Sequence, residues 1–382
     1  MKPLLLAATL LLAGPAAAAT YIPASDAEIV TTLPAAKDPQ RQAIQRLRRQ
    51  MADRPGDAAG AAQLAQHYIE LSRRQGDPRY LGQAEAVLQP WLTRSHVPAD
   101  IWLLQGTIQQ SQHRFEAALQ SLQRAADQDP RNPQVWLTLA SIYQVRGNFA
   151  AARNACGRLA GTLGPAEAAD CLAGVDSVTG RAHEAMQHWQ QRLAGNLLEN
   201  WAVPWLQVQL AETSQRLGQL QQAAQWFERA MQAEPDSYLK AAYADFLLQQ
   251  GQPAKVITLL QGDTHVDALL LRLAEAHRAL RSPNTAGLAQ QLQQRFDAAR
   301  ARGEQLHQRE EARLQLNLLG NATKALQLAQ ANWHFQKEPA DARLLLQAAL
   351  AARQPAAAQV AVRWLMESGL EDRTSWQLAS RL

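Results

Sequence analysis

Two histidines near residue 185 are the first candidates for chemistry in this sequence. His183 and His188 flank Glu184 in the order used by zinc proteases, but that motif places its histidines four residues apart on one helical face. At about 100° per residue, a spacing of five turns the two rings roughly 140° apart around the helix axis. The spacing therefore indicates polar-face residues beside Trp189 and argues against a zinc site.

Other catalytic patterns are missing from the sequence. His307, Glu310 and Glu311 lack the second histidine of the inverted zinc motif. There is no phosphate-binding Gly-x4-Gly-Lys-Ser/Thr loop and no Gly-x-Ser-x-Gly nucleophile turn. Neither cysteine has a neighbouring histidine or basic cluster that would lower its thiol pKa. We therefore expect no catalytic site, no metal and no cofactor.

The first nineteen residues have the pattern of a secretory signal peptide. Lys2 precedes an apolar run from Leu4 to Ala13, and small residues at 16–19 suit a signal peptidase. That run is about ten residues long, whereas a helix needs roughly twenty to span a bilayer. We expect cleavage of residues 1–19 before Thr20, a periplasmic or secreted product, and no transmembrane segment in the mature chain.

The composition is that of a helical protein with little net charge. Hydrophobic residues make up 47% of the 382 residues, mainly Ala and Leu, and strand-like clusters of Val, Ile and Thr are scarce. The net charge of +4 is spread along the chain. The basic run of Arg41, Arg46, Arg48 and Arg49 indicates a solvated helix face, so we expect no nucleic-acid partner.

The elements that must position these residues follow from an internal repeat. One lag of 34 residues relates five pairs: Trp102 and Trp136, Gly106 and Ala140, Phe115 and Phe149, Ala118 and Ala152, and Leu122 and Cys156. Trp136-x2-Leu139-Ala140-x2-Tyr143 resembles the tetratricopeptide unit, which reads Trp-x2-Leu-Gly-x2-Tyr. Ala223-x3-Phe227 followed by Pro235 repeats its second half. The match is firmest over residues 99–235.

The resemblance implies an all-α fold, an α-solenoid of stacked antiparallel hairpins coiled into a right-handed superhelix. Residues 20–57 are expected to form a lead-in segment and a first helix, and residues 58–382 the repeat array. Gly147, Gly180, Gly218 and Gly251 stand where first helices should end. Extending the register predicts nine hairpins, at residues 58–91, 99–128, 133–161, 166–194, 204–233, 237–261, 266–302, 306–335 and 341–367.

The two cysteines lie on either side of a predicted turn. Cys156 falls late in one hairpin and Cys171 early in the next. The midpoint between them lies at the predicted turn, between Leu163 and Gly164. Residues equidistant from a turn lie side by side on antiparallel helices, and an oxidising compartment favours a disulfide. Two free thiols used as small core residues are the alternative.

In the tetratricopeptide family the first helices line a concave, protein-binding surface. Carried over by position, the groove residues are Leu103, Thr107, Gln110, Leu137, Ser141, Gln144, Val208, Glu212, Gln215 and Asp245. The chaperone-binding subgroup clamps a terminal carboxylate with Lys and Asn, where this sequence has Leu, Thr and Ser. Trp201 and Trp205 are either core residues or an exposed aromatic pair that anchors a partner.

These observations favour an exported, non-catalytic adaptor that binds a protein or peptide segment during envelope assembly, secretion or polysaccharide export. An enzyme or metal-handling protein on a helical array is one alternative, and a self-associating structural protein is another. The sequence leaves the partner's identity and the oligomeric state open.

Overall fold

The computed structural model describes residues 39–195, 198, 202–233, 235–302 and 308–382. Every regular element in these ranges is helical, so the predicted all-α fold class is confirmed. None of these helices combines the length and the apolar character that crossing a bilayer requires. The predicted signal peptide and the lead-in residues 20–38 lie outside the described residues, so both stay predictions.

After α1 (Pro39–Asp53), the described helices pair into nine antiparallel hairpins, numbered here from the N-terminus. The helices are α2 (Ala58–Gln75) and α3 (Arg79–Leu92) in hairpin 1, α4 (Ala99–Ser111) and α5 (Phe115–Gln128) in hairpin 2, α6 (Pro133–Val145) and α7 (Phe149–Arg158) in hairpin 3, α8 (Pro165–Asp176) and α9 (Ala182–Ala194) in hairpin 4, α10 (Ala202–Arg216) and α11 (Leu220–Ala230) in hairpin 5, α12 (Ser237–Gln249) and α13 (Pro253–Leu260) in hairpin 6, α14 (Asp267–Ala279) and α15 (Asn284–Ala301) in hairpin 7, α16 (Gln308–Arg313) and α17 (Ala322–Phe335) in hairpin 8, and α18 (Pro339–Ala351) and α19 (Gln359–Ser368) in hairpin 9. α16 continues as a π-helical turn, Leu314–Leu318, and α20 (Arg373–Ala379) ends the array.

Each hairpin turns through one residue with a left-handed backbone. These residues are Gly76, His113, Gly147, Gly180, Gly218, Gly251, Arg281, Gly320 and Arg353. The four glycines expected to end first helices are all among them. Glycine suits this conformation because it has no Cβ to meet the neighbouring carbonyl. In hairpins 2, 7 and 9 a larger residue adopts it instead.

Apolar side chains bury the hairpins against one another in clusters that cross hairpin boundaries. One cluster joins hairpins 2–4 through residues such as Leu122, Leu139 and Cys156, and another joins hairpins 5–7. Trp102 and Trp136 pack against the first cluster, which agrees with a packing role for the repeated tryptophan. A single hairpin could not bury its own apolar face, so stacking supplies the core.

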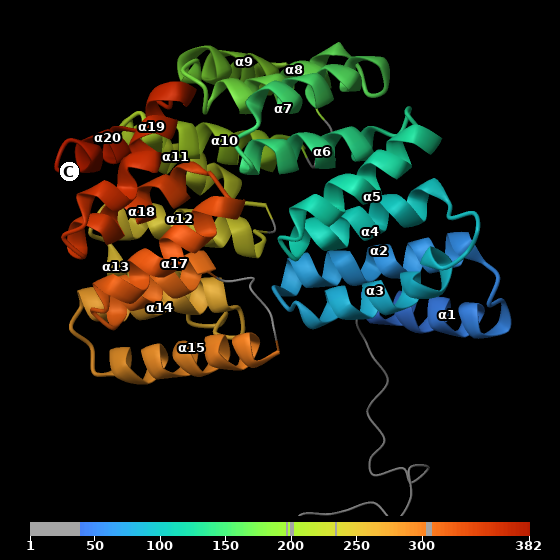
Figure 1. Cartoon of the computed structure of the whole chain (residues 1–382), viewed down its shortest axis with the longest axis horizontal. Coiled ribbons are helices and arrows are strands. Elements are labelled where there is room, and N and C mark those ends of the chain that lie inside the picture. Colours follow the sequence, from blue (N-terminus) through green and yellow to red (C-terminus); the bar gives the residue numbers. More distant parts are fainter. Residues whose placement is uncertain (1–38, 196–197, 199–201, 234, 303–307) are drawn as a thin grey trace, which may run out of the picture.

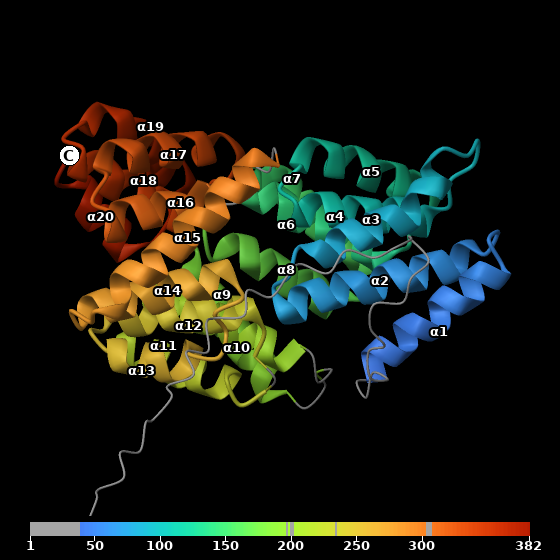
Figure 2. The same cartoon turned by 90° about the horizontal axis from the view of Figure 1, so that it is seen from below.

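The solenoid curves far enough for its C-terminal hairpins to return beside its middle (Figures 1 and 2). The backbone N–H of Lys337 donates to the carbonyl of Val145 at 2.7 Å, and the N–H of Ala182 donates to the Glu371 carboxylate at 2.7 Å. At the other end, a Cβ on Gly76 of hairpin 1 would lie 2.6 Å from Val266, which precedes hairpin 7. The array therefore closes on itself along the edge formed by its turns.

Candidate functional site

The first helices of hairpins 6–8 are joined by a network of charged side chains. Arg313 of α16 donates to Asp245 of α12 (Nη2–Oδ1 2.9 Å) and to Glu275 of α14 (Nη2–Oε2 2.5 Å). Arg272 donates to the other Asp245 oxygen at 2.6 Å, and Asn317 donates to Glu275 at 2.7 Å. Hairpins 6 and 8 are not neighbours in the stack, so side chains can bridge them only on the inner, shorter side of the curve. The network therefore marks the concave surface.

This network holds Asp245 in its ionised form. Burial alone would raise the pKa of Asp245, but the charges of Arg272 and Arg313 outweigh burial and hold that pKa well below its usual range. The carboxylate keeps its charge at neutral pH, so Asp245 ties α12 to α14 and α16.

A second group of charges surrounds Tyr238, which at 59% is the most exposed Trp, Tyr or Phe side chain in the described part of the chain. Its hydroxyl donates to Glu212 Oε1 of α10 at 2.8 Å. The charges of Glu338, from hairpin 9, and Arg309, from hairpin 8, also affect the pKa of Tyr238. Burial raises the pKa of Tyr238 well above its usual value, and the charges of Glu212 and Glu338 add to that shift. Tyr238 and Glu212 therefore lie where α10 and α12 face charged side chains of hairpins 8 and 9. We call this region of the concave surface the Tyr238 hollow.

Two carboxyl groups of the Tyr238 hollow are poorly solvated. Burial raises the pKa of Glu212; Arg216 opposes the shift, and the negative charge of Glu338 adds to it. Burial also raises the pKa of Asp341 to about 6, although Arg309 donates to it at 3.4 Å. The Glu212 carboxylate would be stabilised by an approaching cation, whereas Asp341 is buried and already accepts hydrogen bonds from Asn332 and the backbone N–H of Glu338.

The arginines of the Tyr238 hollow are held by other groups. Arg216 donates to the carbonyl of Ser177 at 3.2 Å and to the Thr213 hydroxyl at 2.9 Å. Arg343 pairs with Asp372 at 3.3 Å. Arg309 lies 2.9 Å from Glu338. Glu212 is left without an ion pair among the described residues, with the Tyr238 hydroxyl as its hydrogen-bond donor.

The structure divides the predicted groove residues into buried and accessible ones. Leu103, Thr107 and Val208 are 6–8% exposed, so they offer almost no surface to a partner; this part of the prediction is corrected. The reason is close stacking, since Leu103 and Val208 fill core clusters between hairpins. Seven predicted groove residues retain exposed surface: Gln110, Leu137, Ser141, Gln144, Glu212, Gln215 and Asp245. Their role in binding stays a prediction.

The predicted aromatic pair is only partly described. Trp201 lies outside the described residues. Trp205 is 39% exposed and meets the buried Trp189 edge to face, with ring centroids 6.5 Å apart. The Trp205 side chain therefore packs partly against Trp189, and the rest of its surface remains accessible to a partner.

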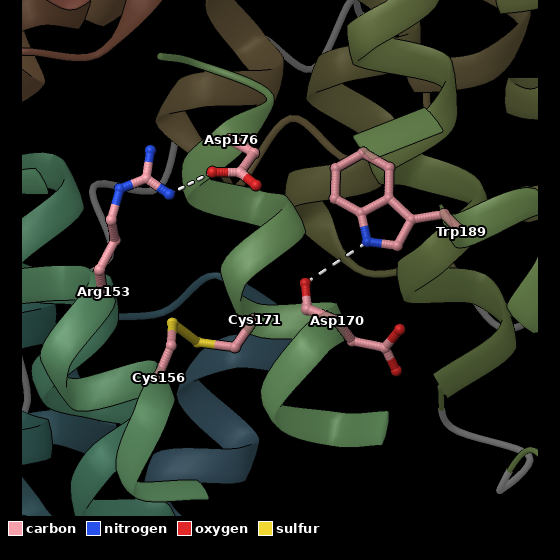
Figure 3. The surroundings of a disulfide bond; sticks show 6 residues. All are labelled: Arg153, Cys156, Asp170, Cys171, Asp176 and Trp189. Atoms are coloured by element: carbon pink, nitrogen blue, oxygen red, sulfur yellow. Dashed lines mark hydrogen bonds and ion pairs between the residues drawn. A yellow bond between two sulfur atoms is a disulfide. The ribbon is translucent and has the colours of Figure 1, made fainter. Parts of the chain in front are cut away.

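The two cysteines form a disulfide between α7 and α8, as the sequence predicted (Figure 3). Their Cα atoms are 5.4 Å apart, and both side chains are buried. Beside the bond, Arg153 of α7 pairs with Asp176 of α8, and Trp189 Nε1 donates to the Asp170 carbonyl at 3.4 Å. The disulfide thus joins hairpin 3 to hairpin 4 within a well-packed junction.

His183 and His188 have different surroundings on α9. His183 is exposed, whereas His188 Nε2 lies 2.8 Å from Asp170 Oδ1, which also accepts from Arg192. Within the described ranges, no three His, Cys, Asp or Glu side chains are grouped to hold a metal ion. His307 lies outside those ranges.

Sequence reasoning missed Tyr238 and the charges of hairpins 7–9. Tyr238 lies two helical turns before Asp245, on a helix whose groove face was already identified, so its position could have been found. Arg309 and Arg313 could not be placed by register, because the π-helical turn Leu314–Leu318 adds a residue to their helix.

Comparisons with known proteins support the repeat assignment. Family models described as tetratricopeptide repeat match residues 110–171 and 206–237. No curated protein sequence matches the chain.

Several solved structures resemble the chain at low identity. PilW, a type IV pilus biogenesis factor, is 20% identical over 52% of this chain and 94% of its own, with a TM-score of 0.40. A Rap protein complexed with competence and sporulation factor is 13% identical over 90% and 95%, with a TM-score of 0.48. A tetratricopeptide repeat protein from Parabacteroides merdae is 14% identical over 80% and 99%, with a TM-score of 0.38.

The family assignment depends on the family models and on the repeated hairpins. The first match runs from the end of α4 to α8 and the second covers α10 and α11, so both fall on stacked hairpins of the described fold. This chain contains tetratricopeptide repeats, which the family models match at residues 110–171 and 206–237.

Proposed function

We propose that this chain is an exported, non-catalytic adaptor that binds a segment of another protein in the Tyr238 hollow. Tetratricopeptide arrays serve as protein-interaction scaffolds, and their curvature creates concave binding surfaces. The observation that carries the proposal is Tyr238 itself. A 59% exposed aromatic ring on the concave side, with charges around it from hairpins 5, 8 and 9, has the chemistry of a protein-binding hot spot.

The groove continues beyond the Tyr238 hollow in this proposal. Gln215 donates to Gln249 of the next first helix at 2.6 Å, so amide groups join α10 to α12 at the C-terminal end of α12, away from Tyr238. In hairpins 2 and 3, Gln110, Ser141 and Gln144 offer further polar surface. Amide side chains of this kind can hydrogen-bond the backbone of an extended or helical segment.

The place of action in this proposal is the bacterial periplasm or the outside of the cell. Support comes from the signal-peptide pattern of residues 1–19. An adaptor there would serve envelope assembly, secretion or polysaccharide export.

Photo-cross-linking tests the adaptor function. Tyr238 is replaced by p-benzoylphenylalanine, which keeps the first aromatic ring and carries a photoreactive benzoyl group in place of the hydroxyl. The cells are then irradiated with the protein in its native compartment. The matched control carries the same residue at Leu220, which is 39% exposed but begins the second helix of hairpin 5. We expect one protein to be captured from position 238 and not from position 220.

Two other results would count against the adaptor. Capture of only a second copy of this chain from position 238 would favour the self-associating structural protein. Equal labelling from both positions would show that the Tyr238 hollow has no specific protein partner.

A further inference from the structure

We infer that the Tyr238 hollow binds a partner segment through a lysine or arginine side chain, which lies over the Tyr238 ring and pairs with Glu212. This inference rests on the proposed adaptor function and specifies the chemistry of the partner. The juxtaposition that carries it is an exposed aromatic ring hydrogen-bonded to a carboxylate that has no ion pair among the described residues.

The first step is the geometry of Glu212. Its Oε1 accepts from the Tyr238 hydroxyl at 2.8 Å, which leaves the second carboxylate oxygen open to a donor beside the ring. Arg216 lies one helical turn further along α10, but it makes no ion pair with Glu212, and its Nη2 donates to Ser177 and Thr213. Glu212 thus lacks the charged donor that a half-buried carboxylate normally has.

The second step is the charge around the hollow. Four carboxyl groups, Glu212, Glu338, Asp341 and Asp372, stand against three guanidinium groups, Arg216, Arg309 and Arg343. Burial is the main cause of the upward shifts in the pKa values of Glu212 and Asp341, and the negative charge of Glu338 adds to both. A segment bearing a cation is attracted to such a site, whereas a terminal carboxylate is repelled.

The third step is a precedent within the same chain. Arginine guanidinium groups lie over five aromatic rings: Arg48 over Tyr68, Arg94 over Trp91, Arg124 over Trp102, Arg158 over Trp136 and Arg229 over Trp226. Arg48 also donates to the Tyr68 hydroxyl at 2.6 Å. Among the described residues, no arginine covers Tyr238, which is the most exposed Trp, Tyr or Phe side chain of that part of the chain. A partner's cation would complete the same arrangement, gaining both the cation–π attraction and a charge-assisted hydrogen bond.

Peptide selection tests the inference without knowledge of the partner. A phage-displayed library of random 12-residue peptides is panned against the full chain, and selected peptides are measured by fluorescence polarisation. We expect Lys or Arg to be enriched at one fixed position. Replacing that residue by citrulline or norleucine should weaken binding about tenfold, the loss of one charge-assisted contact.

Variants of the chain identify the site that the cation occupies. Glu212→Gln should weaken the selected peptides about tenfold, and Tyr238→Leu by a similar factor, because each removes one half of the contact. Tyr238→Phe keeps the ring and should keep most of the affinity. Glu184→Gln, an exposed carboxylate change on α9, is the matched control and should leave binding unchanged.

Several outcomes would overturn the inference. They are selection without Lys or Arg enrichment, failure to select any peptide, or equal binding to wild type and Glu212→Gln. Capture of a partner by cross-linking from position 238, together with one of these results, would leave the adaptor function intact and reject only the cation.

Discussion

At the residue scale, the Cys156–Cys171 disulfide has a measurable effect on stability. The bond closes a loop with a sequence separation of 15 residues, and a loop of this size is expected to stabilise the fold by about 3 kcal/mol. The double variant Cys156→Ala/Cys171→Ala should therefore lose about 3 kcal/mol of unfolding free energy in urea titration. Both side chains are buried, so alanine removes the bond without exposing a new polar group.

The control for this experiment is the reductant. Wild-type protein unfolded with reductant should match the double variant, and the double variant should not respond to it. Two alkylatable thiols in the unreduced, denatured protein would contradict the disulfide.

The two cysteines could be paired from the sequence because distance from a turn determines which residues meet on antiparallel helices. No such rule could identify Tyr238 as a candidate binding residue. Its importance depends on Glu338 and Arg309, which come from hairpins about seventy or more residues further along and approach it only through the curvature of the whole solenoid. The spacing of residues within one repeat carries no information on how closely hairpins 8 and 9 approach Tyr238.

At the scale of elements, the hairpin turns differ in backbone strain. Arg281 is exposed and adopts φ 53°, a conformation that costs a non-glycine residue about 1–2 kcal/mol. Arg281→Gly relieves that cost but adds freedom to the unfolded chain, so we expect a net gain of about 0.5–1 kcal/mol in unfolding free energy. Urea titration measures this gain.

The matched reverse change is Gly251→Ala. Gly251 has φ 66°, and no atom lies within 4 Å of an added Cβ, so the substitution tests the backbone conformation alone. It should cost about 1 kcal/mol. If both variants had the stability of wild type, the turns would not be strained as described.

Hairpin bounds followed closely from the sequence because each is set by local signals. The repeated glycine ends the first helix, and the periodic Ala and Leu positions define the packed face. Hairpin 3, which turns at Gly147, was therefore expected at residues 133–161, and it occupies α6, α7 and the short 3-10 turn Leu159–Gly161. The three turns without glycine carry no such signal, so His113, Arg281 and Arg353 were not recognised as turn residues. Burial of Leu103 and Val208 was missed because register gives the face of a helix but not how closely the next hairpin packs.

At the scale of the whole molecule, closure of the solenoid joins segments that are far apart in sequence. A Cβ on Gly180 of hairpin 4 would lie 3.2 Å from the carbonyl oxygen of Gly369, after hairpin 9, and a Cβ on Gly147 would meet Lys337 and Trp364. In an open solenoid each hairpin contacts only its neighbours, and distant hairpins can unfold separately. Contacts across the closure should therefore make hairpins 3 and 4 cooperative with hairpin 9.

Gly180→Ala tests this closure against Gly251→Ala. Both glycines have a left-handed backbone, with φ 77° and 66°, so the two variants share the same local cost of about 1 kcal/mol. Only at Gly180 does the added methyl group also press against the opposite segment.

We expect Gly180→Ala to lose more unfolding free energy and to speed hydrogen exchange at the Lys337 amide, which donates across the closure to Val145. The Lys337 amide should stay protected in Gly251→Ala, because no atom lies within 4 Å of the Cβ added at Gly251. Equal losses with an equally protected Lys337 amide would mean that the C-terminal hairpins rest against hairpins 3 and 4 without stabilising them. The walls of the Tyr238 hollow would then be held only by the stacking of neighbouring hairpins.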